Sequence, residues 1–129
     1  MLTVHLSGGE AMLKKAMLAG KAIDAKVIGV SILTSLEESD TMALFDNKLD
    51  HQIRNLFEIA VKANLDGVVC SPHELEMSNK IVNSDSIKIT PGIRDIKVAD
   101  DQARIMSAKE AIEKGATFLV IGRPITQAK

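Results

Sequence analysis

Two arginine-bearing segments near the end of the chain have the residue types that bind a phosphate group. The segments Thr90-Pro91-Gly92-Ile93-Arg94 and Val120-Ile121-Gly122-Arg123-Pro124 each follow a short apolar run. A glycine lets an anion approach the main chain, and an arginine guanidinium donates paired hydrogen bonds to phosphate oxygens. We therefore expect Arg94, Gly122 and Arg123 to bind a phosphorylated ligand such as a sugar phosphate or a nucleotide.

Other polar residues are weaker candidates for chemistry. Ser7-Gly8-Gly9 has the form of a phosphate-binding turn, but so short a glycine motif has little specificity. We expect His5, at the end of an apolar run, to be buried and hydrogen-bonded, and His51 and His73 to lie on the surface. The histidines lack the HxH and HExxH spacings, so no zinc site is expected. Cys70 follows two valines and is expected to be a core thiol.

Short apolar runs alternate along the chain with segments of helical periodicity. Strands are expected at residues 2–6, 26–33, 67–70, 87–89 and 118–121, and helices at 10–22, 51–64, 71–82 and 108–114. A short helix at 42–45 fits within the polar loop 34–50, and 94–106 is expected to be a long polar loop. Strict alternation requires parallel strands joined by helical crossovers, with the ligand-binding loops at the carboxyl ends of the strands.

Several residues mark where these helices should begin and end. Ser7 is a candidate N-cap for the first helix, and Pro72 suits the first turn of the third. Ser107 and Glu110 have the spacing of a capping box for the fourth helix, which Gly115 should end.

Length and composition bound the fold and the class of partner. The chain has 129 residues, about half of a typical (β/α)8 barrel of roughly 250. We therefore predict a single domain over residues 1–129, an α/β fold with parallel strands and alternating helices that forms a partial (β/α)8 TIM barrel. The formal net charge is −1 with interspersed charges, and the only aromatic residues are three Phe, which argues against nucleic-acid binding.

The same composition bears on location. The chain has one Cys and no apolar run near the ~18 residues of a membrane span, and its first residues do not have the form of a signal peptide. We expect a cytoplasmic protein in a reducing compartment, with no membrane partner.

Taken jointly, the motifs resemble the orotidine 5'-monophosphate decarboxylase family. The resemblance covers essentially the whole chain in order, through Val4–Gly9, Leu33–Ser35, Leu65–Ser71, Thr90–Arg94, Asp101-Gln102 and Ile121–Thr126. It implies a (β/α)8 barrel, usually a homodimer, that removes CO2 from C6 of the pyrimidine without a cofactor. The product would be UMP, in pyrimidine biosynthesis. The resemblance also implies a set of substrate-binding residues: Thr34 holds the nucleotide, Pro91 lines the base pocket, and Arg94, Gln102, Gly122 and Arg123 bind the 5'-phosphate.

The family's catalytic centre is not matched. That centre is an Asp and Lys network that precedes the strand resembling Val4-His5, so the chain corresponds to about strands 4–8 of the barrel. Asp95-Ile96-Lys97-Val98-Ala99-Asp100 fits the family's Asp-x-Lys-x-x-Asp pattern literally, but it follows Pro-Gly-Ile-Arg instead of an apolar strand. We therefore assign no catalytic residue and predict that the isolated chain, a truncated product or a gene fragment, is inactive.

Two alternatives remain open at this point. One is a related barrel enzyme that acts on a hexulose or pentulose phosphate, since such relatives share a Gly-Arg phosphate-binding motif. The other is a non-catalytic half-barrel that binds phosphorylated ligands or associates through its open edges. The expected partners are a small-molecule nucleotide (OMP or UMP), together with either a homo-oligomer or the missing N-terminal half.

Overall fold

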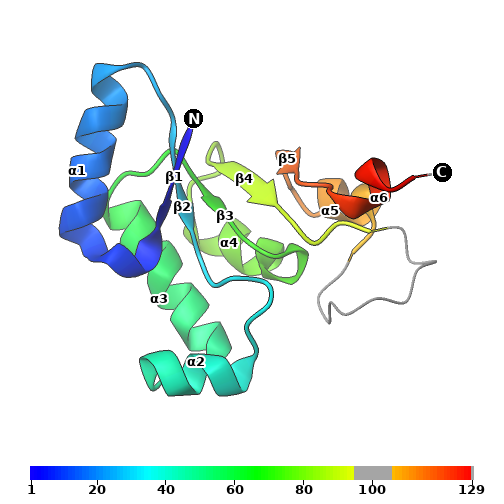
Figure 1. The fold of residues 1–129 in the computed structure, drawn as a ribbon. Helices are drawn as coiled ribbons and strands as arrows, with labels where there is room; N and C mark the ends of the chain where they lie inside the picture. The colour runs from blue at the N-terminus through cyan, green and yellow to red at the C-terminus, as the bar shows by residue number, and fades with distance from the viewer. Residues whose placement is uncertain (95–105, 129) are drawn as a thin grey trace.

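A computed structural model describes residues 1–94 and 106–128, which form one parallel sheet with helices between its strands (Figure 1). The strand order is β1-β2-β3-β4-β5, and every neighbouring pair is parallel. The strands are β1 (Leu2–His5), β2 (Val27–Val30), β3 (Gly67–Val69), β4 (Ile87–Thr90) and β5 (Phe118–Leu119). The predicted order of five parallel strands is therefore confirmed.

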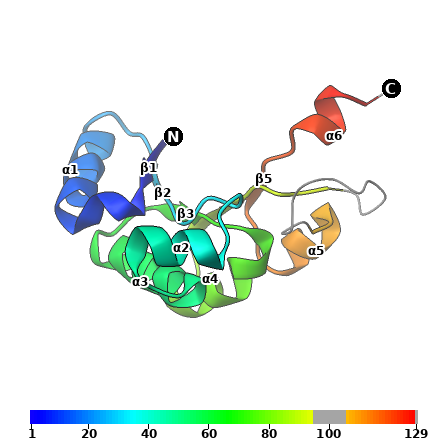
Figure 2. The same ribbon diagram turned by 60° about the horizontal axis from the view of Figure 1, so that its bottom comes forward.

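The helices follow the strands in turn. They are α1 (Gly9–Ala22), α2 (Glu38–Phe45), α3 (Leu49–Lys62), α4 (Leu75–Ile81), α5 (Ala108–Glu113) and α6 (Arg123–Thr126), with 3-10 turns at Leu6–Gly8 and Pro72–Glu74. Figure 2 shows α3, α4 and α5 on the same side of the sheet. No described helix combines the length and the hydropathy that crossing a bilayer requires.

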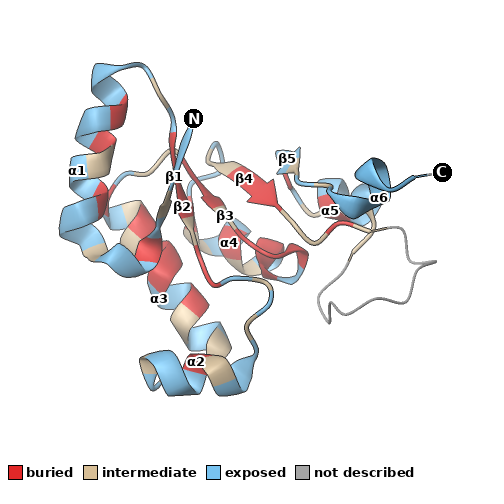
Figure 3. Ribbon diagram, viewed as in Figure 1, coloured by how far each residue is buried: buried red, intermediate tan, exposed pale blue. Residues whose placement is uncertain are grey.

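The core lies between the sheet and these helices. Val68 of β3 points to the helix side, where it packs with Leu13 of α1, Phe57 of α3 and Leu75 of α4. All four side chains are fully buried. Because partners in a parallel pair point to the same face, the register also places Val4, Gly29 and Lys88 on this side. Figure 3 shows the buried residues concentrated in β2, β3 and β4.

The opposite face of the sheet is only partly covered. The register places His5, Val30, Val69 and Phe118 there, and Phe118 is 51 % exposed. His5 is exposed as well, so the prediction of a buried histidine is wrong. His5 lies on β1, an edge strand that pairs with β2 alone among the described strands. His51 and His73 are exposed, as predicted.

Some helix boundaries differ from those predicted. Ser7 lies in a 3-10 turn, and α1 instead begins after Gly8 without a side-chain cap. The short helix predicted at 42–45 begins earlier, at Glu38, because a capping box at Glu37 starts it. The predicted third helix is divided into the turn at Pro72 and α4.

The end of the chain mixes confirmed and missed features. Ser107 and Glu110 form the predicted capping box of α5, and Gly115 follows with a φ of 98°, which suits glycine. Gly122-Arg123-Pro124 was expected to be a loop. The structure places Arg123 in the first turn of α6, where Pro124 has a φ compatible with a helix start.

Cys70 is the predicted core thiol, and it gives the chain a pH-dependent stability. Burial, followed by the Glu74 carboxylate, raises the pKa of the Cys70 thiol to about 12. In the unfolded chain this thiol loses its proton at about pH 8.5. The contribution of the buried, protonated thiol to the unfolding free energy is therefore complete below that pH and falls as pH rises. We predict a loss of up to about 1.4 kcal/mol of unfolding free energy per pH unit above that point. Urea unfolding at rising pH should show this slope, and the Cys70→Ala variant should lack it.

Candidate functional site

The predicted substrate-binding residues that the structure describes lie beyond the carboxyl ends of the strands. Thr34 follows β2, Pro91 and Arg94 follow β4, and Gly122 and Arg123 follow β5. This is the end of a parallel sheet at which ligands bind. Gln102 and the Asp95–Asp100 pattern lie outside the described residues.

A hollow of about 310 Å³ lies beside the two arginine-bearing segments. Its walls come from the ends of β4 and β5 and from the start of α5, and they are Ile93, Arg94, Ser107, Ala108, Ile121 and Pro124. Arg94 is half-buried, whereas Arg123 is exposed next to the lining residue Pro124. The structure thus places Arg94 beside the segment that contains Gly122 and Arg123. Among the lining residues one side chain is cationic and none is a carboxylate, which suits an anionic ligand.

Main-chain hydrogen bonds fix the position of Arg94. The Arg94 amide donates to the Met106 carbonyl at 3.1 Å, and the Met106 amide donates to the Gly92 carbonyl at 3.4 Å. Ile93 and Met106 form an isolated parallel bridge. These contacts hold the two ends of the segment between Arg94 and Met106 side by side. They also place Ser107 at the hollow that Arg94 lines.

Ser107 was missed as a wall of the site. Its capping box with Glu110 is visible in the sequence, and the Ser107 hydroxyl lies 2.6 Å from the Glu110 carboxylate. The box indicates only where a helix begins. The place of Ser107 at the hollow depends on the bridge between Ile93 and Met106, for which the sequence gives no signal.

Gly122 leaves open space next to the main chain. A Cβ built on this residue meets no described atom within 4 Å, so internal packing does not require glycine there. The Gly122 carbonyl accepts from the amides of Ile125 and Thr126 at 2.9 Å and 3.0 Å, which fixes the start of α6. A fixed, open stretch of main chain beside two arginines can receive a phosphate oxygen at close range.

Thr34 lies farther along the same edge. It is half-buried and does not line the hollow, and β3 separates its strand from β4. Two strand spacings amount to about 10 Å, roughly the reach of a nucleotide from its phosphate to its base. Pro91 directly follows β4, on the Thr34 side of β5 in the order of the strands. The arrangement fits an elongated ligand whose anionic end lies at β4 and β5.

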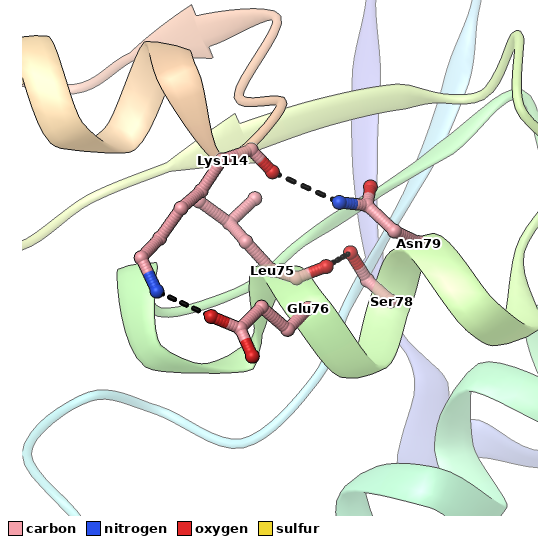
Figure 4. A network of polar contacts seen from close by, with 5 residues as sticks. All are labelled: Leu75, Glu76, Ser78, Asn79 and Lys114. Atoms are coloured by element: carbon pink, nitrogen blue, oxygen red, sulfur yellow. Dashed lines mark hydrogen bonds and ion pairs between the residues drawn. The ribbon is translucent and has the colours of Figure 1, made fainter.

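The end of α5, which leads into β5 and then to Gly122, contacts α4 through side chains (Figure 4). Asn79 donates to the Lys114 carbonyl at 2.9 Å, and the Lys114 ammonium lies 2.5 Å from the Glu76 carboxylate. These contacts matter because β5 pairs with β4 at only two positions, Ile89 with Phe118 and Thr90 with Leu119. The end of α5 is therefore a second anchor for β5.

We predict that Asn79→Ala loosens this unit and lowers the unfolding free energy by about 1 kcal/mol, the usual value of one hydrogen bond. Amide hydrogen exchange in β5 should become faster, while exchange in β2 stays the same. Glu76→Gln is the matched control, because it removes only an exposed ion pair of the same network and such pairs contribute little. Equal exchange rates in the Asn79→Ala variant and the wild type would show that pairing with β4 alone holds β5.

The described residues do not include a cluster of three His, Cys, Asp or Glu side chains placed to hold a metal ion. The residues that line the hollow offer anion binding by a guanidinium group at the edge of a largely apolar surface.

Comparison with known proteins gives the site a family context. The sequence profile of the orotidine 5'-phosphate decarboxylase / HUMPS family matches residues 1–129. The chain is 42 % identical to the orotidine 5'-phosphate decarboxylase of Actinobacillus succinogenes, with 100 % of this chain and 58 % of the relative covered. It is 43 % identical to the orotidine 5'-phosphate decarboxylase of Wolbachia pipientis, with 99 % of this chain and 57 % of the relative covered.

A solved structure agrees with these relatives. The crystal structure of orotidine 5'-phosphate decarboxylase from Lactobacillus acidophilus matches the whole chain with a TM-score of 0.79 at 32 % identity, and 57 % of that chain is covered. The open parallel sheet and this partial coverage confirm the prediction of a partial barrel. The chain spans a little more than half the length of its relatives, and it belongs to the orotidine 5'-phosphate decarboxylase / HUMPS family.

Proposed function

We propose that this chain is the substrate-binding part of an orotidine 5'-phosphate decarboxylase, which converts OMP to UMP and CO2. Arg94, Gly122 and Arg123 bind the 5'-phosphate, and Gln102 belongs to the same set. Thr34 and Pro91 contact the nucleoside end of the ligand. The groups that carry out the decarboxylation lie in the part of the relatives that this chain does not match.

The observation that supports this proposal best is the hollow at the ends of β4 and β5. Arg94 lines it, and the open main chain of Gly122 lies in sequence between two of its lining residues, Ile121 and Pro124. The relatives named above are decarboxylases, which favours a nucleotide over a hexulose or pentulose phosphate. A phosphate at this hollow would leave the rest of a nucleotide free to extend along the strand ends toward Thr34.

Titration of the isotopically labelled chain with UMP tests the proposal by NMR. We expect saturable shifts of the Gly92, Gly122 and Arg123 amides and, at the other end of the ligand, of the Thr34 amide. Uridine, which lacks the phosphate, should not shift the Gly122 signal, and inorganic phosphate should shift it without moving Thr34. Tighter binding of ribulose 5-phosphate than of UMP would overturn the assignment in favour of a sugar-phosphate enzyme.

The proposal also assigns a partner to the open edges of the sheet. In the described part of the chain β1 and β5 each pair with only one neighbour. Exposed apolar side chains lie near both edges, Leu18 and Ile23 at the β1 end and Phe118 and Ile125 at the β5 end. Unpaired edges and apolar patches of this kind favour association. Three further strands would complete an eight-stranded barrel, so the partner is a polypeptide of three βα units from the unmatched part of the family.

A second copy of the chain is a poorer fit to those edges, because two copies would contribute ten strands to a barrel that needs eight. We therefore propose that the expected homo-oligomer forms between completed barrels and not through the open sheet edges. Light scattering with and without the added three-unit polypeptide distinguishes the two arrangements. A monodisperse monomer that does not bind the added polypeptide would contradict the proposal that the open sheet edges pair with it.

A further inference from the structure

A buried carboxylate links the ends of two strands on the helix side of the sheet. Glu74 lies in the 3-10 turn before α4 and is only 5 % exposed. Its carboxylate accepts a hydrogen bond from the Ser31 hydroxyl at 3.2 Å and another from the Ser71 amide at 3.1 Å. Ser31 directly follows β2, and Ser71 follows β3 by two residues. One side chain thus joins two of the loops that leave the carboxyl edge.

The surroundings of Glu74 contain other buried polar groups. The β3–β4 register places Lys88 on the same face of the sheet as Val68, and Lys88 is also 5 % exposed. Cys70 lies close to both charged groups, since the Glu74 carboxylate raises the pKa of its thiol and Lys88 lowers it. Burying a carboxylate costs free energy that an apolar side chain of similar size would avoid. What Glu74 provides, and an apolar residue would not, is a defined direction for the groups that donate to it.

The position of Ser31 connects Glu74 to the nucleotide end of the proposed site. The Ser31 amide donates to the Val69 carbonyl at 3.1 Å, so its main chain and its side chain are both held. Thr34 follows three residues later, within a turn that is closed by the Leu36 amide donating to the Leu33 carbonyl at 3.0 Å. The direction in which the chain leaves β2 therefore decides where Thr34 lies.

We infer that Glu74 is a positioning residue for nucleotide binding. It holds Ser31 at the end of β2 so that Thr34 points to the nucleoside end of the ligand, and it does not touch the ligand itself. This inference rests on the proposed function, because it concerns the same site. It predicts a specific pattern: loss of Glu74 weakens contact with the nucleoside and leaves the phosphate end, at β4 and β5, unchanged.

The test compares Glu74→Gln, Ser31→Ala and the double variant with the wild-type chain. For each protein the affinities for UMP and for inorganic phosphate are measured, together with stability to urea. We expect about a tenfold loss of UMP affinity in Glu74→Gln, no further loss in the double variant, and unchanged affinity for inorganic phosphate. The Thr34 amide signal should move in all three variants.

Ser78→Ala is the matched control, because Ser78 is a buried residue of α4 whose hydroxyl donates to the Leu75 carbonyl at 2.8 Å and not to the segment that leaves β2. It should lose stability and keep the wild-type affinity for UMP. If Glu74→Gln does not fold, Ser31→Ala carries the test alone. UMP affinity equal to wild type in Ser31→Ala and Glu74→Gln, or equal losses of UMP and phosphate affinity, would overturn the inference. A wild-type chain that binds neither ligand would instead refute the proposed function.

Discussion

These 129 residues alone should not decarboxylate orotidine 5'-monophosphate above the uncatalysed rate, and addition of a polypeptide with the three βα units that would complete an eight-stranded barrel should produce decarboxylation. Enzymes accelerate their reactions by about 10⁶-fold or more, largely through charged groups fixed at the reacting atoms. The described hollow offers a cation for the phosphate end of the ligand and no carboxylate. Phosphate binding contributes to a rate only when it holds the substrate against such groups.

The present chain matches 58 % of the Actinobacillus succinogenes relative. The experiment mixes this chain with a polypeptide that spans the remaining, unmatched part of that relative. UMP formation is followed with each polypeptide alone and with the mixture. The mixture should be active and both single polypeptides inactive. A mixture that contains the Arg123→Ala chain tests whether activity depends on the proposed phosphate-binding residues, and it should show a lower rate. Decarboxylation by this chain alone would refute the assignment of the chemistry to the missing part.

Replacement of Arg123 should have the second-largest effect. A hydrogen bond to a charged group contributes about 1.5–3 kcal/mol, so Arg123→Ala should weaken UMP binding by roughly 10- to 100-fold. Arg123 is exposed, and therefore the unfolding free energy should hardly change. Arg123→Lys should recover only part of the affinity, because a lysine keeps the charge without the paired donors of a guanidinium.

Isothermal titration with UMP and with uridine measures this effect. Uridine binding should be the same in Arg123→Ala and the wild type, since the nucleoside has no phosphate to lose contact with. Arg54→Ala, which removes an exposed arginine from α3, is the matched control for a general change in charge and should bind UMP like the wild type. An equal loss of affinity in both arginine variants would show that only the overall charge matters.

The sequence predicted the sheet well because its signals are local. Each strand is a short apolar run and each crossover has a helical period, so element types and parallel pairing follow directly. Boundaries failed where weak local signals competed. Ser7 had the residue type of an N-cap, but the chain forms a 3-10 turn there before α1 begins. Pro124 was taken as part of a loop, although proline also suits the first turn of a helix such as α6.

The site was predictable in part for a related reason. Arg94, Gly122 and Arg123 stand out because glycine and arginine after a strand have few other roles. Ser107 and Glu74 did not stand out, because their contribution depends on contacts between distant segments. The bridge from Ile93 to Met106 brings Ser107 to the hollow, and a hydrogen bond across 43 residues joins Glu74 to Ser31. Pattern and spacing along the chain carry no information about such pairings.

The unbroken strand order has a consequence for how the chain acquires its structure. Each described strand pairs only with the strands next to it in sequence, so no pairing between described strands skips a unit. Every pairing spans one helical crossover, so the contacts stay within consecutive units, although parallel pairing itself forms more slowly than contacts within a helix. The units can be added one after another as they leave the ribosome, β1 with β2 first and β5 last. A polypeptide cut at a boundary between units then forfeits a single interstrand ladder and keeps all the others.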